Sequence, residues 1–588
     1  MKVQPSRNIR QRRGNILVLS AVLMIVMMGF IALSVDVGYM NNVKTEMDRA
    51  VDAGALAGAS ALPSGQTDAE AAARSIVAMN LVGNTSLAGE QVEVTMGHWD
   101  VNQHHFTPDS NAPSAVKVSA LKDDAPLFFA NVFGHDKFGV RSSAIAMFEP
   151  RDIMVVLDYS GSMNDDSEFR SIDYDPNDSF TGLPRATIEA NLAQIYSELG
   201  APSFGSMVFN PTWMNVPGQA PTNSYRPQIH VEHRYKRVFI TSTKPFDRVR
   251  VYRSSSRYKT FYGQGTYNSS DGVWERELTY DDYRRIYKVK VRSGHNSSNT
   301  SSWNRYEETF DFGSASKVRS AARKAWGLNA VSYPYPGGSW DEYIDYCCDQ
   351  YNRDSRQANE NAGYKYKFGY MNYVNYLLEK RSSYSSTPVL WQTTEQPITA
   401  VKNSVDVFLN LMQGMNGGDN IGLAIYNSSS GWGKLEQGLT PNFGVISTLS
   451  RERQSNHYHS MTNIAAGLDT ARNELINNGR PNVVRRIVLM TDGIPTWPES
   501  TSYARSLAIQ AAQDCADAGI QVATISLGAG ADVPLMSQIA DITAGSAQPI
   551  KFVVEGGRPV SEVEDDLRDV FQWVASARPL RLVAAGDD

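Results

Sequence analysis

Oxygen-bearing side chains recur at three separate places in this chain, and together they could hold a metal ion. Asp158, Ser160 and Ser162 alternate in one turn, Thr462 precedes a helical pattern, and Asp492 heads a later turn. Such ligands suit a hard cation, Mg²⁺ or in its place Mn²⁺ or Ca²⁺, rather than zinc. A lone Asp-x-Ser-x-Ser is more often a hydrogen-bonded turn, so the interpretation depends on the elements that position the three pieces.

The turns at Asp158 and Asp492 each follow a short apolar run, 153–157 and 486–490. Runs of this length, rich in β-branched residues and bounded by polar ones, are typical of buried parallel strands. Open α/β sheets bind ligands at the carboxyl ends of such strands. We therefore expect both turns at a ligand-binding edge of a sheet.

Strands and helices alternate along the second half of the chain. Apolar runs predict strands at Asn420–Ile425, Val522–Leu527 and Lys551–Val554, and amphipathic patterns predict helices at Ser502–Ala518 and Val560–Ala575. This alternation predicts an α/β fold with a doubly wound, mostly parallel sheet of the Rossmann-like kind.

Asp-x-Ser-x-Ser, a later Thr before a helix and a later Thr-Asp-Gly after a strand resemble the metal-ion-dependent adhesion site of von Willebrand factor type A domains. The resemblance implies that Ser160, Ser162 and Thr462 contact the metal directly. It implies that Asp158 and Asp492 act directly or through water. It also implies an open coordination position, which takes an acidic group from a protein partner.

A large insertion separates the first metal-binding turn from the rest of this domain. Type A domains normally continue straight into their first helix, but here the next amphipathic candidate is Pro397–Leu409. The type A domain is therefore expected over 151–166 and 395–578, with 167–394 inserted at the rim of the site.

The insertion is predicted to have a β-sandwich-like part, 226–293, and a helical, aromatic-rich part, 315–380. The first part carries 16 Lys and Arg against 7 Asp and Glu, a local excess of 16 − 7 = 9 positive charges. Basic residues interleaved with Tyr could bind anionic glycans or nucleic acid, but a solvated sheet face is the simpler interpretation. Because the whole chain has a formal charge of −6, no nucleic-acid partner is expected.

The N-terminus has the pattern of a membrane anchor. Residues 2–13 contain five basic residues and no acid, and Ile16–Val35 follows with 20 residues free of charge. That length suffices to cross a bilayer, whereas a cleaved signal peptide has an apolar core of roughly 7–15 residues. The positive flank predicts a single-pass protein of the bacterial cytoplasmic (inner) membrane, with its N-terminus in the cytoplasm and the bulk periplasmic or extracellular.

Four short stretches of the opening also carry a family resemblance. They are Arg13-Gly14-Asn15 and the segments Gly29–Leu33, Val35–Gly38 and Asp52–Ala59. They resemble the N-terminal segment of TadE/TadG-like proteins, which belong to the Tad (tight adherence) Flp-pilus assembly system. Cleavage after Gly14 would leave Leu19 where processed prepilins carry Glu, so we expect no prepilin cleavage.

The anchor region is expected to have two sections. Residues 1–62 would form the cytoplasmic basic tip, the transmembrane helix and its helical extension, and 84–150 would form a small β-rich, Tad-associated region. His98, His104 and His105 lie in the second section, but their spacing fits no metal motif, so a solvated loop is expected. The three cysteines of the chain are too few for a disulfide scaffold.

Three functions follow from these features. The favoured one is a membrane-anchored, metal-dependent protein-binding or adhesion protein, TadG-like and linked to Flp/Tad pilus assembly or cell-surface attachment, with other Tad components among its partners. The second is a structural component of a secretion or pilus machine with a metal-free type A domain, and the third a metal-dependent hydrolase. Because the sequence has no Gly-x-Ser-x-Gly, His-Glu-x-x-His or phosphate loop, we expect no enzyme and no catalytic residue.

Overall fold

The computed structural model forms two compact units: one comprises Met1–Arg151, Asn410–Asp419 and Trp573–Asp588, and the other Asp152–Leu409 and Asn420–Gln572. The structure describes residues 14–100, 103–109, 113–172, 183–222, 226–234, 237–279, 286–294, 305–348, 367–415, 417–427, 433–481, 483–528, 530–555, 560–576 and 579–583. The basic stretch at 2–13 lies outside these ranges.

The first unit is built on one long helix, α1 (Gly14–Ala61). Its first part is exposed and apolar, and within the described ranges α1 is the helix long and apolar enough to cross a membrane. The helix ends just before Pro63, which cannot continue it. A second helix, α2 (Gln66–Met79), packs against the later part of α1, where Gly54 and Gly58 allow close approach.

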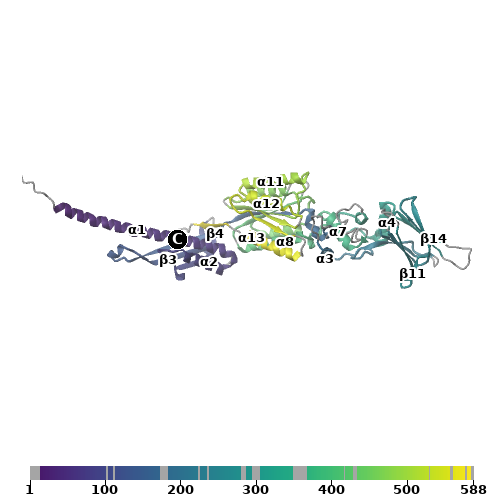
Figure 1. Ribbon diagram of the computed structural model, residues 1–588, viewed down its shortest axis with the longest axis horizontal. Helices are drawn as coiled ribbons and strands as arrows, with labels where there is room; N and C mark the ends of the chain where they lie inside the picture. Colours follow the sequence, from purple (N-terminus) through teal and green to yellow (C-terminus); the bar gives the residue numbers. More distant parts are fainter. Residues whose placement is uncertain are drawn as a thin grey trace, which may run out of the picture. The chain divides into compact units, whose positions relative to one another are not determined.

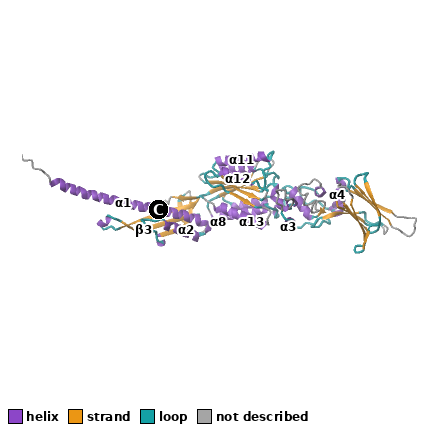
Figure 2. Ribbon diagram, in the orientation of Figure 1, coloured by secondary structure: helices purple, strands orange, loops and turns teal. Residues whose placement is uncertain are grey.

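A five-stranded sheet, ordered β2-β1-β3-β4-β21, completes this unit (Figure 2). Its strands are β1 (Val92–Asp100), β2 (His105–Pro108), β3 (Ala115–Pro126), β4 (Lys137–Phe148) and β21 (Leu580–Val583). Every pairing is antiparallel, including that of the C-terminal β21 with β4.

Two of the three histidines of this region lie on strands rather than in the expected loop. His98 lies on β1 and His105 on β2, and these two strands pair with each other. His98 Nδ1 lies 3.2 Å from Ser114 Oγ, so the sheet already supplies that ring with a hydrogen-bond partner. The loop prediction holds for His104, which lies in the exposed turn between the two strands. It was wrong for His98 and His105, because β1 continues to Asp100 and β2 is a strand of only four residues with one large apolar side chain.

The second unit contains a six-stranded sheet in the order β17-β16-β5-β18-β19-β20. Its strands are β5 (Arg151–Asp158), β16 (Asn420–Tyr426), β17 (Lys434–Thr440), β18 (Val484–Thr491), β19 (Gln521–Leu527) and β20 (Lys551–Val554). β16 pairs parallel with β5, and β19 pairs parallel with both β18 and β20, whereas the edge strand β17 pairs antiparallel with β16. This confirms the predicted mostly parallel α/β sheet.

Helices cover both faces of this sheet, so the fold is doubly wound (Figures 1 and 2). They are α8 (Ile398–Met415), α9 (Phe443–Glu452), α10 (Ile464–Asn477), α11 (Thr501–Asp517), α12 (Val533–Thr543) and α13 (Val560–Ser576). Met154 and Val156 of β5 share a core with α10, α11 and α12. On α8 and α13, the rings of Phe408 and Phe571 meet at 5.4 Å. Burial on both faces explains why the strands read as continuous apolar runs.

Within the described ranges, two antiparallel sheets and four helices lie between β5 and α8. The sheets are ordered β10-β9-β13-β14 and β11-β12-β8-β7-β6-β15. Their strands are β6 (Thr212–Pro217), β7 (Ile229–Arg234), β8 (Arg237–Ser242), β9 (Phe246–Tyr252), β10 (Tyr258–Tyr262), β11 (Thr266–Asn268), β12 (Val273–Thr279), β13 (Lys288–Gly294), β14 (Arg305–Asp311) and β15 (Lys367–Phe368).

The helices of this segment are α3 (Arg185–Glu198), α4 (Ala315–Trp326), α5 (Trp340–Cys348) and α7 (Tyr370–Arg381). Trp340 and Tyr373 share one buried core with Val231 and Val249 from the two sheets. Trp340 and Tyr373 therefore contribute to packing. The limits expected for the type A domain, 151–166 and 395–578, and for the insertion, 167–394, stay predictions.

Candidate metal-binding site

Asp158 lies at the carboxyl end of β5, fully buried, and its carboxylate organises the turn that follows. Ser160 N–H donates to Asp158 Oδ1 at 2.9 Å, and the Thr491 hydroxyl donates to Asp158 Oδ2 at 2.8 Å. Burial raises the pKa of Asp158 to about 6, although hydrogen bonds from Ser160 and Thr491 oppose the rise. Asp158 thus ties the end of β5 to the end of the neighbouring strand β18.

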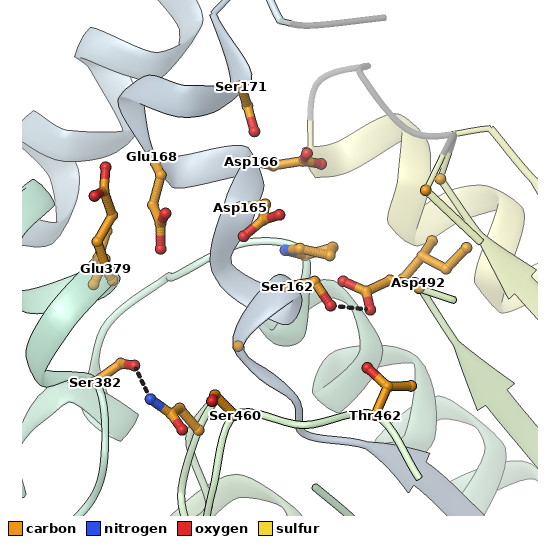
Figure 3. A pocket seen from close by; sticks show the side chains of 18 of the residues that line it. Ser162, Asp165, Asp166, Glu168, Ser171, Glu379, Ser382, Ser460, Thr462 and Asp492 are labelled. Atoms are coloured by element: carbon orange, nitrogen blue, oxygen red, sulfur yellow. Dashed lines mark hydrogen bonds between the residues drawn. The ribbon is translucent and has the colours of Figure 1, made fainter. Parts of the chain in front are cut away.

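The two serine hydroxyls of the turn converge on the carboxylate at the end of β18. Ser160 Oγ and Ser162 Oγ lie 3.0 Å apart, and Ser162 Oγ donates to Asp492 Oδ1 at 2.7 Å (Figure 3). Because β5 and β18 are adjacent in the sheet, residues more than 300 positions apart meet at one edge.

The loop before α10 is bonded to the same turn. Ser455 Oγ donates to the Ser160 carbonyl at 2.7 Å, and Gly161 N–H donates to the Ser460 carbonyl at 3.2 Å. Asn463 then caps α10 by accepting a bond from Ala466 N–H. These bonds bring Thr462, between the loop and the helix, to the serine turn.

Thr462 directs its side chain toward the space beside Ser162 and Asp492 (Figure 3). Gly493 lies between the two hydroxyls: a Cβ at this position would lie 3.4 Å from Ser162 Oγ and 3.7 Å from Thr462 Oγ1. The absence of a side chain at Gly493 leaves that space to the oxygen atoms.

These groups line a cavity of about 520 Å³ at the carboxyl edge of the sheet. One wall comes from the type A core, with Ser162, Thr462 and Asp492. Another comes from the segment after the serine turn and from α7, and it contributes four carboxylates: Asp165, Asp166, Glu168 and Glu379 (Figure 3). Burial raises the pKa of Asp166 to about 6.

The five predicted residues thus lie around one edge of the sheet. Ser162, Thr462 and Asp492 line the cavity, Ser160 touches Ser162, and Asp158 lies beneath the serine turn. Within the described ranges, no group of three or more His, Cys, Asp or Glu is arranged to hold a metal. A metal at this edge would therefore depend on hydroxyl ligands.

Sequence reasoning included Thr491 and Gly493 in the Thr-Asp-Gly motif but gave them no role, and the structure shows that both support the site without being proposed ligands. Both flank Asp492 in the Thr-Asp-Gly motif, so their position next to a candidate ligand was the available signal. Sequence reasoning missed the carboxylate wall, because Glu379 reaches the cavity from a helix more than 200 residues after the serine turn.

Comparison with known families matches three segments of the chain. Residues 14–61 match the family described as "Putative Flp pilus-assembly TadE/G-like", and residues 53–146 match "Putative Tad-like Flp pilus-assembly". Residues 385–557 match the von Willebrand factor type A domain. No curated protein matches the chain.

Several solved structures share similarity with the chain at low identity. The von Willebrand factor domain of the type V pili tip protein Mfa5 from Porphyromonas gingivalis is 13% identical, with 32% of this chain and 89% of that chain covered and a TM-score of 0.24. The pilus adhesin SpaC from Lactobacillus rhamnosus GG is 14% identical, with 30% and 28% covered and a TM-score of 0.23. The PilB minor pilin from Streptococcus sanguinis is 10% identical, with 66% and 97% covered and a TM-score of 0.26.

The matched segments are pilus-related and adhesion-type domains rather than enzymatic families. Their order along the chain is the one that its motifs predicted. The chain thus joins an N-terminal region that matches the Tad (TadE/G-like) Flp pilus-assembly families to a later segment that matches the von Willebrand factor type A domain.

Proposed function

We propose that this protein is a membrane-anchored, extracytoplasmic binding protein of a Flp/Tad pilus system. Its type A domain would bind a protein partner through a divalent cation at the edge formed by the ends of β5 and β18. The proposal is supported most by one observation: hydroxyl and carboxylate oxygens from three distant segments converge on one cavity.

The residues at this edge fit a hard divalent cation. Ser160, Ser162 and Thr462 offer neutral hydroxyl oxygens, and Asp158 and Asp492 offer carboxylates, which is the donor chemistry that Mg²⁺ and Mn²⁺ prefer. The Thr462 hydroxyl forms no hydrogen bond within the described part of the chain, so it remains available as a ligand. Ser160, Ser162 and Thr462 would hold the ion, with Asp158 and Asp492 directly or through water.

When bound, the cation would supply a positive centre that attracts an acidic group of a partner. Because the hydroxyl ligands are neutral, they do not cancel the positive charge of the ion, which stays available to such a group. The cavity beside the ligands is large enough to admit a side chain from another protein. This chemistry favours capture of a ligand over turnover.

The pilus assignment rests on the two N-terminal family matches, which together cover residues 14–146. The apolar part of α1 would anchor the chain in the inner membrane, with the binding domain on the periplasmic or outer side. Other Tad components are then the nearest candidates for the acidic partner.

Calorimetric titration of Mg²⁺ and Mn²⁺ into the full chain in detergent tests the metal site. We expect saturable binding of one ion that Asp492→Asn weakens at least about tenfold, the scale on which metal sites respond to altered ligand support. Asp541→Asn is the matched control, because Asp541 is an exposed carboxylate of the same domain, paired with Lys551.

Absence of binding by the unmutated chain would contradict the metal-dependent mechanism. The second function, a structural component with a metal-free type A domain, would then take its place. Equal losses in Asp492→Asn and Asp541→Asn would also contradict the site, because they would place the ion elsewhere.

A further inference from the structure

Four large apolar side chains are exposed together at the tip of the β3–β4 hairpin. The exposed fractions are 56% for Phe128, 45% for Phe129, 84% for Val132 and 81% for Phe133. They lie within the ten-residue connection between β3 and β4, 127–136, which includes the short 3₁₀ helix Ala130–Phe133. Soluble surfaces rarely gather so much apolar area in so short a stretch, so the tip has the character of a contact surface.

The tip is attached to α1 through one carboxylate. Asp36 Oδ1 accepts from Phe128 N–H at 2.9 Å, and Asp36 Oδ2 accepts from Phe129 N–H at 3.1 Å and from Ala130 N–H at 2.7 Å. Asp36 is only 4% exposed, and three successive backbone donors make a strong anion site for it. These hydrogen bonds fix the tip at the position of Asp36 along the axis of α1.

Aromatic contacts and the hairpin's own bonds keep the tip in place. The ring of Tyr39 on α1 meets Phe128 at 4.9 Å and Phe138 at 6.1 Å. Within the hairpin, Leu127 N–H donates to the Asp136 carbonyl at 2.9 Å, and Gly134 closes the turn in the left-handed region at φ 87°. Figure 1 shows the hairpin running beside α1 toward the helix's apolar part.

The position of Asp36 relates the tip to the bilayer. Ile16–Val35 is the charge-free part of α1, and 20 helical residues rise about 30 Å, the thickness of the hydrocarbon core. If this part spans the membrane, Asp36 lies at the boundary between hydrocarbon and headgroups. The apolar tip bound to Asp36 then lies at the headgroup–acyl boundary, where Phe and other large apolar side chains of membrane-surface proteins insert.

We propose that the β3–β4 tip is a second membrane contact, in which Phe128, Phe129, Val132 and Phe133 insert into the interfacial layer of the leaflet next to Asp36. The inference depends on α1 being the membrane anchor, and it goes beyond the metal-binding role. A helix anchored alone can rotate and tilt freely, whereas a helix with a fixed lateral contact holds the sheet of this unit in one orientation to the membrane.

Spin labels at single cysteines test this proposal in the full chain, reconstituted into vesicles of palmitoyl-oleoyl phosphatidylcholine. The three native cysteines are first replaced by serine. Labels are then placed by Phe133→Cys at the tip, by Met79→Cys as the matched control, and by Ile25→Cys within the apolar part of α1. Met79 is 72% exposed in the same unit, on α2, which packs against the later part of α1.

Collision of each label with oxygen, which concentrates in lipid, is compared with collision with a water-soluble nickel chelate. We expect the oxygen-to-nickel ratio at position 133 to be several-fold above that at position 79 and to approach that at position 25. Thermal unfolding of each labelled protein, compared with the cysteine-free parent, confirms that the fold is retained.

Equal ratios at positions 133 and 79, with position 25 in lipid, would overturn the tip contact while leaving the anchor intact. Protection of position 133 from both reagents would also overturn it, because a protein partner rather than lipid would then cover the tip. An aqueous signal at position 25 would refute the anchor itself, and with it the proposal.

Discussion

At the scale of single residues, Thr462 is held by its backbone rather than by its hydroxyl. Its N–H donates to Thr496 Oγ1 at 3.0 Å, and its carbonyl accepts from Thr496 N–H at 2.9 Å. The side chain is free to serve as a ligand, since the loop conformation does not depend on it. Substitutions at this position therefore separate metal binding from folding.

We predict that Thr462→Val lowers the affinity for Mn²⁺ by about tenfold or more, while Thr462→Ser retains it. Valine has nearly the shape of threonine but lacks the oxygen, whereas serine keeps the oxygen and loses a methyl group. Calorimetric titration measures the affinities, and thermal unfolding checks that both variants fold like the parent. Equal affinities of the two variants would show that the hydroxyl is not a ligand.

At the scale of elements, the packing of α1 on α2 depends on Gly54. A Cβ there would lie 2.4 Å from Val77 Cγ2 and 3.2 Å from the Ala73 carbonyl oxygen. Gly38, on the same helix, has nothing within 4 Å of the corresponding position. The two glycines therefore form a matched pair for testing this interface.

Gly54→Ala should destabilise the α1–α2 pair by about 1–3 kcal/mol, because overpacking outweighs the better helix propensity of alanine. Gly38→Ala should stabilise the helix by up to about 1 kcal/mol, since only propensity changes. Hydrogen exchange of the α1 amides around each substituted glycine measures the two effects, and the amides next to α2 report on the interface. Equal protection in the two variants would mean that the helices do not pack as described.

The loop between α9 and α10 contains a histidine whose charge is disfavoured. Burial lowers the pKa of His457 to about 4, and the charges of Arg453 and Lys402 add to this effect while Glu436 opposes it. The folded pKa lies below the unfolded value of 6.5, so the unfolded chain binds more protons between pH 4 and 6.5. Stability from this group is thus complete above pH 6.5 and is lost as the pH falls toward 4.

We predict that His457→Phe removes about 1–2 kcal/mol of the acid destabilisation between pH 6.5 and 4, a figure reduced for the partial exposure of the ring. Phenylalanine keeps a ring against Tyr384, whose centroid lies 4.8 Å from that of His457. Urea unfolding of parent and variant across this range measures the difference. Parallel pH curves for the two proteins would contradict the prediction.

Local patterns in the sequence predicted most elements of the type A core. Apolar runs such as 486–490 were read as strands because a strand buried on both faces needs apolar residues throughout. The helix α12 was missed although the sequence signals it: Leu535, Met536, Ile539 and Ala540 follow helical spacing and are buried, and Pro534 marks the start of the helix. The pairing of β21 with β4 joins residues more than 400 positions apart, and four residues carry no signal of their partner.

At the scale of the whole molecule, the sequence predicted the order of the segments along the chain, but it did not predict every segment that lines the cavity. The sequence predicted that Asp-x-Ser-x-Ser, the later Thr and Thr-Asp-Gly meet at one site, because each motif lies at the end of a recognisable strand or at the start of a helix. The carboxylate wall of the cavity comes from the segment just after β5 and from α7, which pack together in a core of their own. No periodicity in the sequence relates Glu379 to Ser162.

The central claim is that a divalent cation binds between the ends of β5 and β18, and anomalous X-ray scattering from crystals of the full chain grown with Mn²⁺ tests it most directly. We expect an anomalous peak within direct coordination distance, about 2 Å, of the hydroxyl oxygens of Ser160, Ser162 and Thr462. Asp492→Asn crystals should show a weaker peak or none. A Mn²⁺ peak at other residues, or no peak at this edge in the unmutated chain, would contradict the claim.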